Sequence, residues 1–147
     1  MDQKIIRGKL DLIRGEVVSS ATRVEFVLGY RLRKYFFPKR NNKSTIFFWN
    51  VINTPYLTFD NKICIYESIP YFKKLKGYSK ISESLRYIQK LRNQMAHWEL
   101  DEKESQLANI IIYTLVGKYR KIIIDDRLVE EYRRHINFLL KKFGYSR

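Results

Sequence analysis

The first quarter of the chain is one long run without a helix-breaking proline. No proline occurs between Lys4 and Phe37, and apolar residues recur there mostly at steps of three or four. Such spacing gathers apolar side chains on one face of an α-helix. The recurring residues are Ile6, Leu10, Ile13, Val17, Val24, Val27 and Leu28. The run predicts one long helix or two stacked helices, and so a fold built on helix packing.

A polar loop ends this first unit. Pro38 and residues 39–43 (KRNNK) interrupt the apolar spacing with turn-forming residues. A short aromatic segment, 47–49 (FFW), follows and is expected to be buried. Ser44 has the side chain of a helix N-cap and stands just before this segment.

A regular apolar stripe predicts a helix in the middle of the chain, after a turn at 77–79 (GYS). The stripe consists of Ile81, Leu85, Ile88, Leu91 and Met95. Ser79 or Ser82 is expected to cap this helix. An earlier helix, running to Phe72, is expected to start at Asp60 and to be weakened or kinked by Pro70.

Two β-branched runs follow, Ile110 to Val116 and Tyr119 to Ile124. They are separated by Gly117-Lys118, which suits a two-residue hairpin turn. A helix over Leu107 to Val116 is the alternative. A last helix is expected after Asp125 or Asp126, ending before Gly144. We therefore predict a single domain over residues 1–147, mainly all-α, as an up-and-down helical bundle with a small β-hairpin before the last helix.

The chain is strongly basic. Lys and Arg total 29 against 15 Asp and Glu, which gives a formal net charge of +14. RNA or DNA is the partner that suits this charge best, because phosphates that bind Lys or Arg release counterions. A highly charged solvated surface is the alternative. The aromatics beside basic residues at Tyr30-Arg31, Lys34-Tyr35 and Tyr71 to Lys74 are suited either to stacking on unpaired bases or to the core.

Several classes of protein are not expected. No segment reaches the roughly 18 to 20 apolar residues that span a bilayer, and residues 1–10 lack the pattern of a signal peptide, so a cytoplasmic location is expected. Cys64 is the only cysteine, which rules out an internal disulfide and a cysteine-based zinc site. No cofactor or metal is expected.

The end of the middle helix carries the residues best suited to chemistry. On a helical wheel Asn93 and His97 lie nearly opposite the apolar stripe, so His97 is not expected in the core. Arg92 lies at the flank of the stripe, about 140° from His97. For Arg92, Asn93 and His97 to meet one substrate, the helix must bend or end there, or a second copy must complete the site.

These residue types suit phosphodiester cleavage. Histidine titrates near neutral pH and can move protons to and from a 2′-hydroxyl or a leaving oxygen. The fork of Arg92 can hold two phosphate oxygens and stabilise charge in the transition state, with Asn93 orienting either partner. In the alternative, Arg92 pairs with a nearby acid and His97 is simply solvated.

The run Arg92-Asn93-Gln94-Met95-Ala96-His97 resembles the signature of HEPN domains, in which arginine, a polar residue and, after a short interval, histidine recur. The order of elements resembles that family over roughly residues 11–143. The resemblance implies a helical bundle that forms a homodimer, whose facing signatures make a composite, metal-independent endoribonuclease site that leaves a 2′,3′-cyclic phosphate. It implies catalytic roles for Arg92 and His97, support from Asn93, and a weaker candidate in Glu25.

Many HEPN proteins act as toxins or abortive-infection effectors in prokaryotic defence, so an antitoxin or a defence-complex partner is expected. One departure concerns control. Relatives silenced by a nucleotidyltransferase antitoxin have a tyrosine two places after the histidine, where this chain has Glu99. That form of control is therefore not expected. Two other functions stay open, a non-catalytic nucleic-acid-binding module and an interaction subunit of a larger complex.

Overall fold

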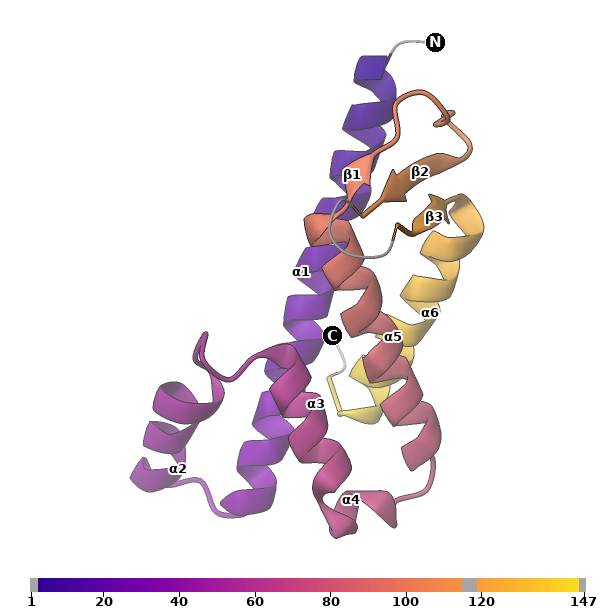
Figure 1. Ribbon diagram of the computed structural model, residues 1–147. Helices are drawn as coiled ribbons and strands as arrows, with labels where there is room; N and C mark the ends of the chain where they lie inside the picture. The colour runs from indigo at the N-terminus through magenta and orange to yellow at the C-terminus, as the bar shows by residue number, and fades with distance from the viewer. Residues whose placement is uncertain (1–2, 115–118, 146–147) are drawn as a thin grey trace.

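One helix, α1 (Gln3–Phe36), runs the length of the molecule in the computed structural model, which describes residues 3–114 and 119–145 (Figure 1). The apolar run at the start of the chain forms this one helix and not two stacked helices. The predicted stripe is buried except for Ile13, which packs partly buried against the core. Hydrophobic burial along this one face anchors α1 to the rest of the fold.

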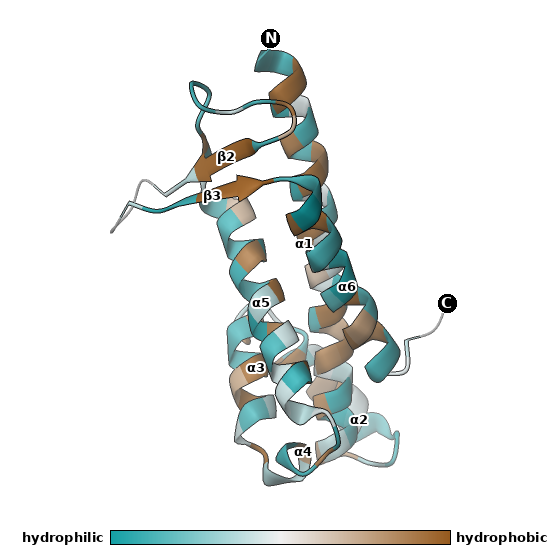
Figure 2. Cartoon of the chain, turned by 90° about the vertical axis from the view of Figure 1, so that its right-hand side faces the viewer, coloured by the Kyte–Doolittle hydropathy of each residue, from teal (hydrophilic) through white to brown (hydrophobic). Residues whose placement is uncertain are grey.

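Three helices pack against α1 and form the bundle (Figure 1). They are α3 (Phe59–Ser68), α5 (Tyr78–His97) and α6 (Asp126–Lys142). The core between them includes Val24, Leu28, Ile63, Leu85, Ile88 and Leu139, each fully buried. The prediction of a mainly-α fold is confirmed. Hydrophilic and hydrophobic residues are mixed along α1, α5 and α6 (Figure 2), and no helix within the described residues has the length and apolar composition needed to cross a membrane.

The helix starts differ in part from the prediction. Thr58 caps α3 by accepting a hydrogen bond from the Asn61 amide at 3.2 Å, and Asp60 lies inside the first turn. Asp125 caps α6, as predicted, by accepting from the Leu128 amide at 2.8 Å. The chain enters α5 through Gly77, whose φ of 84° favours glycine, so the predicted serine cap is wrong.

Pro70 breaks the helix instead of kinking it. Ile69 is extended, with ψ of 116°, as a residue before proline prefers. Pro70 then occupies the first position of the short helix α4 (Pro70–Lys73), where its missing amide donor costs no hydrogen bond. Phe72 of α4 is buried, and α4 packs against α5.

The aromatic segment forms an arm beside the C-terminal half of α1 (Figure 1). The arm consists of α2 (Asn42–Phe47) and the π-helical turn η1 (Phe48–Ile52), with Asn41, not Ser44, as its N-cap. It packs on α1 at Gly29, where an added Cβ would lie 2.8 Å from Cγ2 of Ile52. Phe48 is buried as expected, but 55 % of Trp49 is exposed, so the prediction of a buried segment is wrong for Trp49.

A small antiparallel sheet packs at the end of the molecule that holds the N-terminal half of α1 (Figures 1 and 2). Its strands are β1 (Glu99–Leu100), β2 (Ile110–Tyr113) and β3 (Lys121–Ile124), in that order. The β2–β3 pair confirms the predicted hairpin and excludes the helical alternative, whereas β1 was not predicted. Gly117-Lys118, the predicted turn, lies outside the described residues.

The register of the hairpin differs from the one that a two-residue turn would set. A regular ladder from a turn at Gly117-Lys118 would place Ile112 opposite Ile123. The observed partner of Ile112 is Ile122. This register turns Ile110, Ile112 and Ile124 into the core, and leaves Ile123 exposed.

Candidate functional site

The end of α5 coincides with the end of the signature. His97 is the last helical residue, and Trp98 is extended, with φ of −93° and ψ of 147°. The Trp98 amide still donates to the Gln94 carbonyl at 2.9 Å, after which Glu99 begins β1. The helix therefore ends where the wheel required it to bend, end or meet a second copy.

The faces of α5 agree with the helical wheel. Leu91 and Met95 are buried, Asn93 and His97 are exposed, and Arg92 is half-buried between these two faces. Five residues separate Arg92 from His97, which is about 140° of rotation and about 7.5 Å of rise. The two candidate catalytic side chains of one chain thus leave the helix in different directions.

Arg92 borders a hollow of about 440 Å³ between α1, α3 and the loop before α3. The hollow is also lined by Thr22, Glu25, Phe26 and Lys62. Nη1 of Arg92 donates to Oδ1 of Asn93 at 3.4 Å, and within the described residues Arg92 has no ion pair. The alternative in which a nearby acid neutralises Arg92 is therefore not what the structure contains.

The carboxylate of Glu25 forms an ion pair with a lysine. Nζ of Lys62 donates to Oε1 of Glu25 at 2.7 Å, and the Lys62 side chain is almost fully buried. Glu25 thus lies in the same hollow as Arg92, as a site role would need, but its carboxylate already balances an ammonium group. The predicted catalytic role of Glu25 stays a prediction.

Lys62 is the residue of this hollow that the sequence prediction missed. It brings a second cation to the wall that contains Arg92. A signal was available, because Lys62 falls on the buried stripe of α3 between Phe59 and Ile63, with Tyr66 one turn on. A lysine at a core position of an amphipathic helix is expected only with a partner acid, and Glu25 provides it.

The acids of α3 that face α5 bind another arginine. Arg86 forms ion pairs with Asp60 and Glu67, and Gln89 donates to Asp60 at 3.1 Å. The hydrogen bond from Arg86 is the main reason that the pKa of Glu67 lies below its ordinary value. These contacts neutralise the acidic side of α3 and leave the positive charge of Arg92 available.

His97 lies on the other side of the helix end. It is exposed and, among the residues the structure describes, forms no hydrogen bond or ion pair. The carbonyl of the next residue, Trp98, accepts a hydrogen bond from Nη2 of Arg14 on α1, whereas Nε of Arg14 is buried and has no partner in the described part of the chain. The backbone directly after His97 is therefore fixed to α1.

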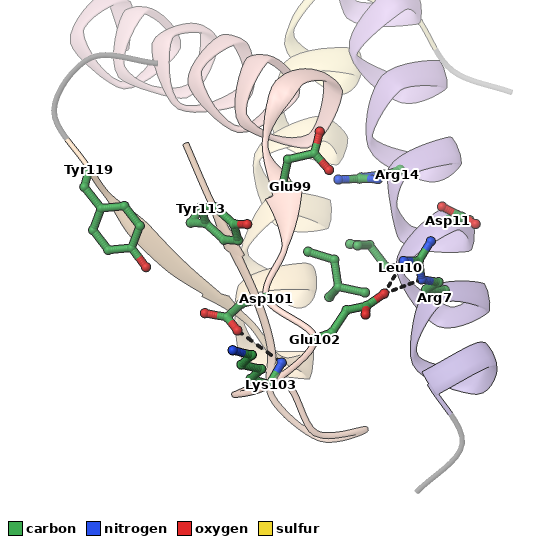
Figure 3. A pocket seen from close by; sticks show the side chains of 11 residues that line it. Arg7, Leu10, Asp11, Arg14, Glu99, Asp101, Glu102, Lys103, Tyr113 and Tyr119 are labelled. Atoms are coloured by element: carbon green, nitrogen blue, oxygen red, sulfur yellow. Dashed lines mark hydrogen bonds and ion pairs between the residues drawn. The ribbon is translucent and has the colours of Figure 1, made fainter. Parts of the chain in front are cut away.

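A polar hollow of about 600 Å³ lies beyond His97, between α1 and the sheet (Figure 3). Arg7 and Arg14 reach into it from α1, opposite Glu99 and Glu102, and Arg7 pairs with Glu102. Acids and bases are mixed along its wall, which gives no net preference for a polyanion. Arg92 does not line this hollow and His97 lines neither of the two, so neither hollow brings the two side chains of one chain together.

No cluster of three His, Cys, Asp or Glu side chains able to hold a metal ion occurs in residues 3–114 and 119–145. No family model, no curated protein and no solved structure matches this chain. The groups suited to phosphodiester chemistry near the end of α5 are the imidazole of His97, the guanidinium of Arg92 and, on α3, the ammonium group of Lys62.

Proposed function

We propose that this chain is a metal-independent endoribonuclease of the HEPN type, with an active site completed by two copies that place their α5 ends against one another. The observation that carries the proposal is the position and the pairing of the three signature side chains at the end of α5. Arg92, Asn93 and His97 all lie off the buried face, and neither Arg92 nor His97 is neutralised by an acid among the described residues. The net charge of +14 supports RNA as the substrate.

A second copy resolves the separation of Arg92 and His97 within one chain. Around a two-fold axis, Arg92 of one protomer meets the His97 of its partner, and the reverse pair forms at the same time. The exposed position of His97 and the end of the helix beside it leave room for such an approach. Asn93 holds Arg92 through its side-chain oxygen.

The proposed reaction is transfer of a phosphodiester to the neighbouring 2′-oxygen. A neutral His97 accepts the 2′-hydroxyl proton while the 2′-oxygen bonds to phosphorus. Arg92 neutralises the charge that grows on the non-bridging oxygens. The bond to the 5′-oxygen breaks, and the same imidazole passes its proton to that oxygen. The products are a 2′,3′-cyclic phosphate and a 5′-hydroxyl.

The remaining expectations belong to the same proposal. Glu25 acts as a positioning residue in it, because its carboxylate holds Lys62 beside Arg92. The enzyme works in the cytoplasm as a toxin or antiviral defence effector, restrained by an antitoxin or another defence protein. Comparing the growth of cells that express the wild type or His97→Ala tests this role, with growth arrest expected only for the wild type.

Cleavage of labelled single-stranded RNA in excess EDTA tests the activity. His97→Ala and Arg92→Ala are each expected to lower the rate by at least about 100-fold, since each removes a transition-state contact. Arg127→Ala, which removes an exposed arginine at the start of α6, is the matched control. Circular dichroism checks that all variants fold. Undiminished cleavage by both signature variants would overturn the proposal.

Mixing the two inactive variants tests the composite site. If Arg92 and His97 act across the two-fold axis, a mixed dimer keeps one intact pair. Random mixing is then expected to restore roughly a quarter of the wild-type activity. No recovery, in a mixture shown to exchange subunits, would place both residues in a site within one chain.

A second candidate function is a non-catalytic RNA-binding module, which the charge of +14 also favours. The wild type would then bind RNA in a salt-sensitive way and release no products. The same assay, run alongside a binding measurement, separates the two functions.

A further inference from the structure

A second hollow adjoins the one that Arg92 lines, and its walls are aromatic and basic. It has a volume of about 160 Å³ and lies between α1 and the arm formed by α2 and η1. Its main lining residues are Phe26, Tyr30, Arg33, Arg40, Phe48 and Trp49. We call it the aromatic hollow. Phe26 borders this hollow and the Arg92 hollow as well, so the two meet at one side chain.

One face of α1 runs beneath both hollows. Thr22, Phe26, Tyr30 and Arg33 follow one another at steps of four, four and three, which keeps them within about 80° on the helix. Thr22 belongs to the Arg92 hollow and Arg33 to the aromatic hollow. A chain-like ligand that follows this face would occupy the two in succession.

The rings of the aromatic hollow are packed on one side and open on the other. Phe48 is buried and meets Phe26 edge-on at 5.4 Å and Trp49 at 5.1 Å between ring centroids. Phe26, Tyr30 and Trp49 are each 40 to 55 % exposed. Phe48 therefore fixes a shelf of large rings whose outer surfaces are uncovered. Such rings gathered at one place are typical of a binding surface.

Arg33 adds a cation that has no counter-charge among the residues the structure describes. Only 6 % of the residue is exposed, and its guanidinium lies 4.5 Å from the ring centroid of Tyr30. Its one side-chain hydrogen bond to a described residue is a long one, 3.5 Å from Nη1 to Oγ of Ser44, while its Nε is buried without a partner. A buried guanidinium without an acid is unfavourable until an anion joins it. Arg40, which is exposed, supplies a second cation at the rim.

We propose that the aromatic hollow binds one unpaired nucleobase of single-stranded RNA, stacked on Trp49, with the adjoining phosphate held by Arg33 and Arg40. Aromatic shelves beside arginines recognise unpaired bases in this way, because every base has a stacking face and every nucleotide a phosphate. The small volume favours a single flat ring over a base pair. This base site would extend the RNA-binding surface of the proposed ribonuclease. It rests on that proposed function in one respect, that the bound strand continues past Phe26 to Arg92.

Tryptophan fluorescence tests the stacking directly. The chain has two tryptophans, Trp49 and Trp98, so Trp98→Phe leaves Trp49 as the only one. Combined with His97→Ala, which keeps the RNA intact, this protein is titrated with a single-stranded 10-mer. Saturable quenching of Trp49 is expected, at the same midpoint as the anisotropy change of labelled RNA. Binding without any change in Trp49 emission would overturn the proposal.

Variants in the His97→Ala background test the energetics with Trp98 in place. Trp49→Ala is expected to weaken binding about tenfold, as the loss of one stacked base does. Arg40→Ala is expected to weaken binding and to lower its salt dependence. Tyr71→Ala is the matched control. It removes a ring that is 57 % exposed beside Arg31 and Lys34, in a hollow away from the Arg92 site, and is expected to change nothing.

Three ligands and one size measurement complete the test. The single strand should bind more tightly than a duplex or an abasic phosphodiester of equal length, and only the single strand should respond to Trp49→Ala. Equal affinity for all three would mean that the hollow binds only phosphate and no base, which would overturn the proposal. So would conversion of a dimer to a monomer by Trp49→Ala, which would assign this surface to a second copy.

The same data keep the two proposals apart. Tight, Trp49-dependent binding by a wild type that releases no products would overturn the ribonuclease and leave the base site standing. Normal cleavage and binding by Trp49→Ala would overturn the base site alone.

Discussion

Nζ of Lys62 lies 2.7 Å from Oε1 of Glu25, and only 3 % of the Lys62 side chain is exposed. The ammonium group has therefore left water and depends on one carboxylate for its charge balance. Glu25 is itself only 19 % exposed, so water does little to replace either partner. Breaking such a pair costs more than removing it.

The first prediction is an asymmetry between the two partners. Glu25→Gln leaves a buried ammonium without a counter-charge and is expected to lower the free energy of unfolding by about 3 kcal/mol. Lys62→Met removes the charge and keeps the apolar stem, so a smaller loss is expected. The double variant should be more stable than Glu25→Gln alone. Urea unfolding at pH 7 measures all three. Equal stability of the two single variants would contradict this account.

A second prediction concerns the contact between the arm and α1. A Cβ at Gly29 would lie 2.8 Å from Cγ2 of Ile52, so in Gly29→Ala the Ile52 side chain or the η1 backbone must shift. We expect a net loss of about 1 to 3 kcal/mol from overpacking, despite the better helix propensity of alanine. A shift of Trp49 emission in the Trp98→Phe protein should accompany it.

Gly15→Ala is the control for this effect. Gly15 lies in the same helix, and an added Cβ meets nothing within 4 Å. Alanine should therefore stabilise the protein there by up to about 1 kcal/mol. If denaturant unfolding gives the same result at both glycines, the close approach at Gly29 has no energetic weight.

A third prediction compares two buried tyrosines. The Tyr132 hydroxyl donates to the Val17 carbonyl at 2.8 Å and lies 2.9 Å from Oγ of Ser20, whereas the Tyr66 hydroxyl is buried and finds no partner among residues 3–114 and 119–145. Tyr132→Phe is expected to cost about 1 to 2 kcal/mol. Tyr66→Phe is expected to be neutral or stabilising, because it removes an unsatisfied polar group. Thermal unfolding compares them, and a larger loss at Tyr66 would refute the hydrogen-bond argument.

A fourth prediction follows from His135. Its Nδ1 lies 2.9 Å from Oγ of the fully buried Ser84, and its ring stacks on Tyr87 at 4.4 Å. Burial is the main cause that lowers the pKa of His135 from its ordinary value of 6.5, against the opposing charges of Glu131 and Glu83. The unfolded chain therefore binds this proton at a higher pH than the folded protein does.

The sign of the effect follows from that difference. The contribution of His135 is complete above about pH 6.5 and is lost as the pH falls towards the lower folded pKa. The urea midpoint should therefore fall between pH 7 and pH 5, and His135→Gln should flatten this slope. Glu16 and Glu67, whose pKa values Arg133 and Arg86 lower from 4.5, lose their contribution mainly below about pH 5 and add little to this slope. A slope unchanged in the variant would exclude His135 as its source.

Periodicity predicted the helices well because burial of one face enforces it. The positions of Leu91, Met95, Asn93 and His97 around α5 agree with a wheel drawn from residue spacing alone. Helix starts were harder to predict, since Thr58 and Asp60 are both good caps and lie two residues apart. The strand β1 is only two residues long and carries no period to detect.

The sequence predicted only those parts of the site that depend on residues close together in the chain. Spacing along α5 placed Arg92 off the core, but the ion pair between Lys62 and Glu25 joins residues 37 apart in sequence. The aromatic hollow likewise depends on how the arm folds back onto α1 at Gly29. Tertiary packing decides such contacts. The catalytic roles of Arg92 and His97 stay predictions until cleavage is measured.

Because α1 is uninterrupted, it limits which changes in the sequence the fold can accept. Its 34 residues form a rod about 50 Å long, with Arg14 of the N-terminal half bonded to the Trp98 carbonyl and Arg33 in the aromatic hollow near the C-terminal end. Inserting one residue between these two arginines would twist the far end by about 100° and advance it by about 1.5 Å. Every side chain beyond the insertion would then face the wrong neighbour. A change in the length of this stretch is therefore expected to disrupt more contacts than any single substitution within it.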